Sequence, residues 1–168
     1  KPDILFTAGN DQGVVEWSIA DKAFIKILFP VQTSVYALHA PACAPLLIAG
    51  ERSGQLNVFD FEQQSLAAKW RHHQSPIFDI QSVASKREWI AVSEDGTASV
   101  WSFQAAPNQA STYPLLLQLG ISSQGIRTMA INPSESKIAF GGKDNLIRVY
   151  SLSDYHLLEV LNGHTFPV

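Results

Sequence analysis

Two adjacent histidines, His72 and His73, are of a residue type that binds metal ions. Neighbouring side chains in an extended segment point to opposite sides, so the two imidazoles could hardly share one ion. His39 and His156 lie in expected strands, with no cysteine or pair of carboxylates nearby. Cys43 is the only cysteine, which excludes a thiolate cluster and an internal disulfide. We therefore predict no metal site and no cofactor.

Acidic residues could also do chemistry, because hydrolysis requires two convergent carboxylates or a nucleophile beside a base. The available carboxylates are those of Asp60, Glu62 and Asp79. They fall at different levels of different repeat units, and the chain has no Gly-Xaa-Ser-Xaa-Gly elbow and no phosphate-binding glycine loop. We interpret these acids as solvated side chains and predict no catalytic residue.

The composition limits the classes of partner. Apolar residues make up 46% of the 168 residues and charged residues only 16%, which is typical of a globular chain. Lys and Arg total 12 against 15 Asp and Glu, so no basic field would attract nucleic acid or anionic lipid. We predict no nucleic-acid partner, no membrane contact and, from the single cysteine, a cytoplasmic location. Because the chain opens without Met, we expect it to be a piece of a longer protein.

The sequence contains an internal repeat, in which residues of the same type recur at regular intervals. Four aromatic residues recur at intervals of 42, 42 and 49, and four β-branched residues recur at intervals of 42, 49 and 42. The aromatic set is Trp17, Phe59, Trp101 and Tyr150, and the β-branched set is Val35, Ile77, Ile126 and Val168. A polar insertion at residues 105–113 explains the longer interval. Two markers with a common period predict a repeat architecture.

Each repeat contains short segments that we expect to be strands. The second strands are residues 4–8, 46–49, 89–92 and 138–140, and the third strands are 14–19, 55–61, 97–103 and 146–152. Turn residues that tolerate positive φ separate them, namely Asp11-Gln12-Gly13, Ser53-Gly54, Asp95-Gly96 and Asp144-Asn145. Fourth strands are anchored by Phe24, Leu66, residues 115–119 and Leu157.

Repeats of about 40 to 45 residues with four strands predict propeller blades. We expect an all-β fold of about four consecutive four-stranded antiparallel blades, forming a single partial β-propeller over residues 1–168. The blades would cover residues 1–30, 31–72, 73–121 and 122–163, with the start of a further blade at 164–168. Exposed sheets at the two open ends predict either pairing of two copies, as an eight-bladed ring, or a continuation of the chain.

The chain resembles the WD-repeat family, whose repeats run from Gly-His to Trp-Asp and whose rings usually have seven blades. Gly163-His164 matches the first dipeptide, with His72-His73 at the same place, and Trp17-Ser18, Phe59-Asp60, Trp101-Ser102 and Tyr150-Ser151 take the place of the second. In this family a His, a Ser or Thr, an Asp and a Trp form a hydrogen-bonded network. The resemblance implies such a network from His73, Ser93, Asp95 and Trp101, and we expect the third blade to be the most rigid.

The resemblance also implies a function. WD-repeat proteins usually contact other proteins through one rim of the ring, so we predict a non-catalytic protein-interaction scaffold. The alternative is a propeller hydrolase or small-ligand binder that uses the axial channel. By position, the partner-binding rim would comprise Tyr36, Phe78, Arg52, Arg127, Glu94, Lys143 and Asn10, next to Ser34, Pro76 and Gly125. Aromatic and Arg side chains often act as binding hot spots, which favours the first four.

Overall fold

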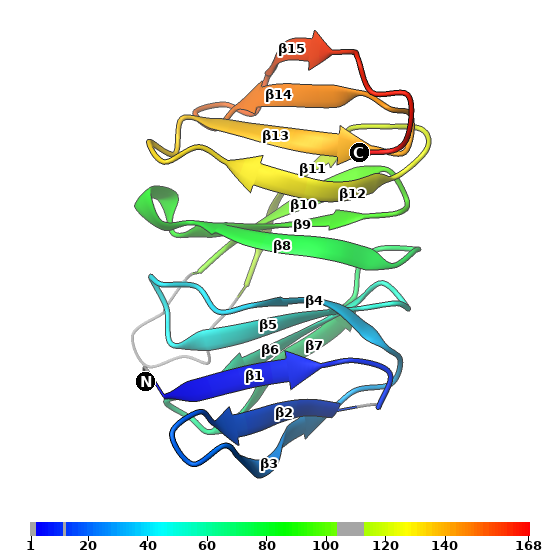
Figure 1. Cartoon of the computed structure of the whole chain (residues 1–168). Coiled ribbons are helices and arrows are strands. Elements are labelled where there is room, and N and C mark those ends of the chain that lie inside the picture. The colour runs from blue at the N-terminus through cyan, green and yellow to red at the C-terminus, as the bar shows by residue number, and fades with distance from the viewer. Residues whose placement is uncertain (1–2, 12, 104–112) are drawn as a thin grey trace.

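The computed structural model of the chain describes residues 3–11, 13–103 and 113–168. These residues form fifteen β-strands and one short 3-10 turn at Ala84–Lys86. The strands group into four antiparallel sheets that stack face to face (Figure 1). The all-β propeller fold predicted from the repeat is confirmed.

The sheets follow one another along the chain. The first contains β1 (Ile4–Ala8), β2 (Gly13–Ser18) and β3 (Ala23–Pro30). The second contains β4 (Val35–His39), β5 (Leu46–Glu51), β6 (Gln55–Asp60) and β7 (Ser65–Arg71). The third contains β8 (Ile77–Val83), β9 (Glu88–Ser93), β10 (Thr97–Ser102) and β11 (Leu115–Gly120). The fourth contains β12 (Ile126–Ile131), β13 (Lys137–Gly142), β14 (Ile147–Ser151) and β15 (Leu157–Leu161).

The aromatic markers occupy the same register in every sheet. Trp17 pairs with Leu5, Phe59 with Leu47, Trp101 with Trp89 and Tyr150 with Ile138, each between the second and third strands. The predicted strands match the observed ones to within one or two residues at their ends. Most of the polar insertion at 105–113 lies outside the described residues, as does Gln12 in the first predicted turn.

Tight turns connect the second and third strands. Gly54, Gly96 and Asn145 adopt positive φ angles of 82°, 84° and 65°, which glycine and asparagine tolerate better than other residues. The first two glycines also lie against backbone, because a Cβ added at Gly54 would come within 2.1 Å of the His73 carbonyl oxygen. The turns are therefore fixed by residue types that the sequence shows directly.

The hydrophobic core lies between adjacent sheets. One cluster joins the first two sheets through Val14, Phe29 and Phe59, and a second joins the next two through Leu56, Ile77 and Trp89. The third lies between the last two sheets. Every residue of β5 and β6 is buried, which explains why these strands are not strictly alternating in polarity.

The innermost strands pack side by side, and polar side chains connect them. The Asp79 carboxylate on β8 accepts a hydrogen bond from the Met129 backbone N–H on β12 at 3.0 Å. Gln81 donates to the Met129 carbonyl at 2.9 Å. His39 on β4 contacts the Ser82 hydroxyl at 3.0 Å, and burial lowers the pKa of His39 although Asp79 opposes the shift. Asp79 therefore joins two blades.

The two end sheets expose apolar side chains. Ile27 on β3 is 60% exposed and Val160 on β15 is 50% exposed. The Val168 backbone N–H donates to the Gly142 carbonyl, as the Val35 N–H donates to the Gly9 carbonyl. Val168 thus has the position of an inner-strand opener against the preceding sheet (Figure 1).

Candidate functional site

Backbone hydrogen bonds bring two groups of predicted rim residues together at one end of the sheets. The N–H groups of Arg52, Glu94 and Lys143 donate to the carbonyls of Ser34, Pro76 and Gly125 at 2.8, 2.9 and 3.0 Å. Each bond places the residue before a hairpin turn beside the opener of the inner strand in the same blade. We call this end the rim, defined by Asn10, Tyr36, Arg52, Phe78, Glu94, Arg127 and Lys143.

An aromatic and cationic row crosses the rim. The rings of Tyr36 and Phe78 stack with centroids 5.8 Å apart and an interplanar angle of 1°. The Arg127 guanidinium lies 5.5 Å from the centroid of Phe78, within the range of a cation–π contact. All three residues follow the opener of an inner strand, in β4, β8 and β12. Tyr36 remains 46% exposed, so the row presents a preformed surface.

Charged residues flank this row. Glu94 and Lys143 form an ion pair between the third and fourth blades. Arg52 is exposed, and no ion pair of its guanidinium occurs within the described part of the chain. It lies between two depressions, one of about 780 Å³ beside Tyr36 and Phe78 and one of about 380 Å³ beside Asn10. The structure therefore brings all seven predicted residues to one end of the sheets.

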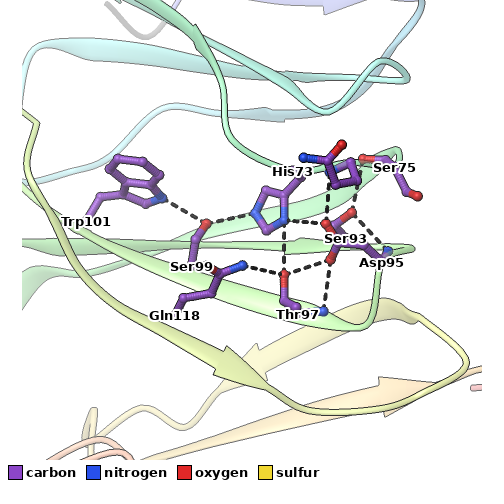
Figure 2. A network of polar contacts seen from close by, with 9 residues as sticks. His73, Ser75, Ser93, Asp95, Thr97, Ser99, Trp101 and Gln118 are labelled. Carbon is purple, nitrogen blue, oxygen red and sulfur yellow. Dashed lines mark hydrogen bonds and ion pairs between the residues drawn. The ribbon is translucent and has the colours of Figure 1, made fainter.

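Below the rim, a polar network crosses the third blade (Figure 2). His73, which is fully buried, contacts the Asp95 carboxylate through Nδ1 at 3.0 Å and the Ser99 hydroxyl through Nε2 at 2.8 Å. The Trp101 indole N–H donates to the same Ser99 hydroxyl at 2.8 Å. The network thus connects the loop before β8 to the hairpin turn and to β10.

A chain of hydrogen bonds runs from Trp101 through Ser99 and His73 to Asp95. A carboxylate only accepts, so Nδ1 of His73 carries a proton and Nε2 can accept from Ser99. The Thr97 hydroxyl donates to the other Asp95 oxygen at 2.7 Å. Burial raises the pKa of Asp95, but the hydrogen bonds from His73 and Thr97 outweigh burial and hold this pKa well below its usual range.

The structure differs from the predicted network in one member. Ser93 does not contact His73; its hydroxyl donates to the Ser75 carbonyl at 3.0 Å and accepts from the Asp95 N–H at 3.2 Å. Ser99 makes the link between His73 and Trp101 instead. Sequence reasoning missed Ser99, although residues two apart on a strand share a face and Ser99 lies two positions before Trp101.

The second blade uses a different buried carboxylate, which sequence reasoning also missed. Glu51 is fully buried and accepts four hydrogen bonds. The donors are the Thr33 N–H at 2.7 Å, the Thr33 hydroxyl at 2.9 Å, the Gln55 amide at 2.6 Å and the Asn57 amide at 2.8 Å. The three donor residues, Thr33, Gln55 and Asn57, lie 42 positions before Ser75, Thr97 and Ser99 of the third blade, respectively. Both networks therefore tie the loop before an inner strand to its hairpin.

The fourth blade has its own version of this connection. Arg148 forms a two-pronged ion pair with Asp144, with nitrogen-to-oxygen distances of 3.1 and 2.7 Å, and the Ser122 hydroxyl donates to Asp144 at 3.0 Å. The hydrogen bond from Arg148 lowers the pKa of Asp144 and raises that of Arg148. A carboxylate near the hairpin thus holds the rim loop in three successive blades.

We expect Glu51→Gln to lower the free energy of unfolding by about 1–3 kcal/mol, because an amide cannot accept from every buried donor around it. Thermal denaturation followed by circular dichroism measures the change. Glu62→Gln, an exposed acid at the opposite end of the same blade, is the matched control and should leave the melting temperature unchanged. Equal melting temperatures for the two variants would contradict the structural role of Glu51.

The residues considered for other chemistry have structural contacts. Asp60 accepts hydrogen bonds from the backbone N–H groups of Glu62 and Gln63, and Asp79 joins two inner strands. The His72 ring packs edge-on against Trp101. Burial lowers the pKa of His72, and the nearby His73 lowers it further. Among the described residues, no three His, Cys, Asp or Glu side chains are grouped as a metal site would require. In the same residues no helix has the length and apolarity to cross a bilayer.

Comparison with known proteins identifies related repeats. Residues 64–102 and 115–151 match the family described as "WD domain, G-beta repeat". The chain is 27% identical over 126 residues to guanine nucleotide-binding protein subunit beta-like protein 1 of Mus musculus, covering 74% of this chain and 37% of that protein. It is 30% identical over 99 residues to guanine nucleotide-binding protein subunit beta-1 of Caenorhabditis briggsae, covering 56% and 27%. The chain therefore spans less than half the length of these relatives.

Solved structures share the arrangement of the sheets. The chain superposes on the computationally designed Ika8 protein with a TM-score of 0.81 at 22% identity, over 100% of this chain and 49% of that one. A chain of the mitotic checkpoint complex gives a TM-score of 0.79 at 15% identity, over 98% and 47%. Both similarities concern the fold, and the chain spans about half of each solved chain.

Proposed function

The chain contains WD40 repeats arranged as consecutive blades of a β-propeller, and we propose that it is a non-catalytic scaffold that binds another protein through its rim. The guanine nucleotide-binding relatives are named after a beta subunit, and one structural neighbour is part of the mitotic checkpoint complex. These relatives support a role in assembly. Because this chain spans only part of the length of these relatives, the proposal is argued from the residues of this chain.

The row of Tyr36, Phe78 and Arg127, in which Tyr36 and Arg127 are exposed and Phe78 is partly buried, carries the proposal. Aromatic and Arg side chains contribute most of the binding energy in many protein interfaces. Here the three side chains already stack on one another in the free protein. A partner that contacts them would not have to pay the full entropy of ordering flexible side chains, so binding would be favoured.

The carboxylates support a non-catalytic role. Asp79, Asp95 and Asp144 each accept hydrogen bonds from protein groups that hold blades or loops in place. Glu51 is fully buried and has its donors around it. A general acid or base must instead reach a proton of the substrate directly or through one water. These acids are better suited to fixing the shape of the rim than to proton transfer.

We expect the double variant Tyr36→Ala/Phe78→Ala to lose at least one partner of the full-length protein, with a decrease of about tenfold or more in the amount recovered. Affinity purification of the tagged protein from its own cells, followed by quantitative mass spectrometry, measures the change. Leu66→Ala is the control, because Leu66 is exposed on β7 near the opposite end of the second blade.

The double variant must first melt within a few degrees of the parent protein, so that a lost partner reports on binding. Partners that depend on the rim would disappear from the double variant and remain with Leu66→Ala. Recovery of every partner in unchanged amounts by a folded double variant would refute the rim as the binding surface.

A further inference from the structure

The two depressions of the rim share Arg52 and differ in character; we call the two together the trough. One side is lined by Tyr36, Pro76 and Phe78, so it is largely apolar and aromatic. The other side is lined by polar residues, namely Asn10, Gln32, Thr33, Ser34 and Ser53. Arg52 lines both depressions and therefore stands at the junction between an apolar side and a polar side.

The trough carries positive charge that the described residues do not neutralise. Glu94, the acid on its wall, is paired with Lys143. Glu51, the residue before Arg52, is buried, and its carboxylate is occupied by Thr33, Gln55 and Asn57. Arg127 contacts the Phe78 ring but lines neither depression. The Arg52 guanidinium therefore remains available to an anion in the trough, in a chain whose net charge is −3.

A polar group on the same wall also lacks a partner. The Ser53 hydroxyl, next to Arg52, is buried without a hydrogen bond to any described residue. Ser53 occupies in the second blade the position that Asp95 occupies in the third, 42 residues later. The second blade therefore has a serine where the third has an acid, which leaves a hydrogen-bonding group unused beside an unpaired cation.

We propose that this trough binds an acidic, extended peptide segment of the partner protein, with a carboxylate on Arg52 and a neighbouring apolar side chain over Tyr36, Pro76 and Phe78. This inference rests on the proposed function and specifies its ligand. Arg binds carboxylates through two parallel hydrogen bonds, so Arg52 supplies both charge and geometry. Successive side chains of an extended peptide point to opposite faces, so a residue and the next but one face the same way; one can reach Arg52 while the other packs on the aromatic side.

Nucleic acid fits the trough less well. It carries a phosphate at every nucleotide, and its binding normally requires many Lys and Arg contacts, whereas Arg52 is the one Lys or Arg among the residues that line the two depressions. The Phe78 ring already contacts both Tyr36 and Arg127, which leaves less of it to stack on a base. The surplus of acids over bases in the chain would also repel a long polyanion more than a short acidic segment.

The test is selection of a random twelve-residue phage-displayed peptide library on the intact protein. Enriched peptides are synthesised with a fluorophore, and their affinities are measured by fluorescence polarisation. We expect enrichment of Asp or Glu near an apolar residue and a loss of affinity of about tenfold or more in Arg52→Glu. The matched control is Arg87→Glu, an exposed arginine in the loop at the opposite end of the third blade, which should bind as the parent does.

A charge exchange strengthens the test. Replacing the selected acidic residue of the peptide with Lys should abolish binding to the parent and restore part of it to Arg52→Glu. Binding that depends on Tyr36 but shows no acidic preference and no effect of Arg52→Glu would overturn the acidic ligand while leaving the rim as a docking surface. Absence of any peptide that depends on Tyr36, together with unchanged partners in the double variant, would overturn both proposals.

A second binding measurement tests whether the trough prefers nucleic acid to an acidic peptide. A fluorescent single-stranded dT20 is titrated against the parent and Arg52→Glu under the same conditions. We expect binding at least tenfold weaker than that of the selected peptide. Tighter binding of dT20 than of any selected peptide, lost in Arg52→Glu, would overturn the acidic-peptide proposal in favour of nucleic acid.

Discussion

Replacing Asp95 with alanine is expected to lower the free energy of unfolding by about 3 kcal/mol, because it removes the charged acceptor of the Nδ1 proton of the fully buried His73 and leaves this proton only the Thr97 hydroxyl at 3.2 Å. The change also removes the acceptor of the Thr97 hydroxyl and of the Gln74 N–H. For a chain of this length, the expected decrease in melting temperature is about 6–12 °C. Thermal denaturation of the purified protein by circular dichroism measures it.

The effect of Asp95→Ala depends on pH in a defined direction. The folded state holds the pKa of Asp95 below its ordinary value of about 4, so the carboxylate contributes stability above that pH. This contribution is lost as the pH falls through the lowered pKa. The difference in stability between parent and variant should therefore be full at pH 7 and shrink as the solution becomes strongly acidic. A difference that grows with acidification would contradict the assignment.

A second aspartate–histidine pair provides the control for Asp95. Asp154 contacts His156 at 2.6 Å, but both side chains are more than half exposed. The hydrogen bond from His156 lowers the pKa of Asp154 to about 2, yet solvent screens an exposed pair. Asp154→Ala should leave the melting temperature nearly unchanged. Equal losses in the two variants would show that burial of the third-blade network does not matter.

Replacing Gly96 with alanine is expected to destabilise the fold by about 3 kcal/mol or more. The φ angle of 84° would cost an L-residue about 1–2 kcal/mol, and a Cβ would come within 1.8 Å of the Ser122 carbonyl oxygen. That oxygen belongs to the backbone of the loop before β12, which is held by the hydrogen bond from the Ser122 N–H to the Gly96 carbonyl. The clash therefore forces turn and loop apart.

Denaturation in urea measures the stability of Gly96→Ala, and reduced yield of soluble protein is the expected companion result. Gly120→Ala is the matched control, since a Cβ at Gly120 on β11 meets no atom within 4 Å. It should leave the unfolding midpoint within a few tenths of a molar of the parent. A midpoint for Gly96→Ala as high as that of Gly120→Ala would show that the turn tolerates a side chain.

The fold could be predicted because its signals are local and repeated. Each strand is indicated by a short apolar segment, and hairpin turns are indicated by Gly or Asn, which tolerate a positive φ, as at Gly54, Gly96 and Asn145. The common register of Trp17, Phe59, Trp101 and Tyr150 follows from the repeat, because equal spacing places equivalent residues at equal depth. The rim residues could also be located, since position within a repeat fixes which end of the blade a residue occupies.

The contacts between side chains could not be predicted in the same way. Glu51 looks like an ordinary surface acid in the sequence, and only the fold shows four donors around it. Ser93 and Ser99 are both serines near Asp95, and the choice of Ser99 as the link to Trp101 depends on which side of β9 and β10 each faces. Neither the pairing of Glu94 with Lys143 nor the stacking of Tyr36 on Phe78 follows from spacing, because each joins different blades.

The sequence by itself determined the all-β architecture, the repeat and the end of the blades at which the rim lies, because turn chemistry and hydrophobic patterning act over a few residues. The tertiary structure alone decided which carboxylates are buried and paired and which cations, such as Arg52, have no acidic partner among the residues that the structure describes. Burial and charge pairing depend on groups far apart in the chain, as in the bond from Met129 to Asp79, which are 50 residues apart, and the sequence spacing of such groups carries no sign of their contact.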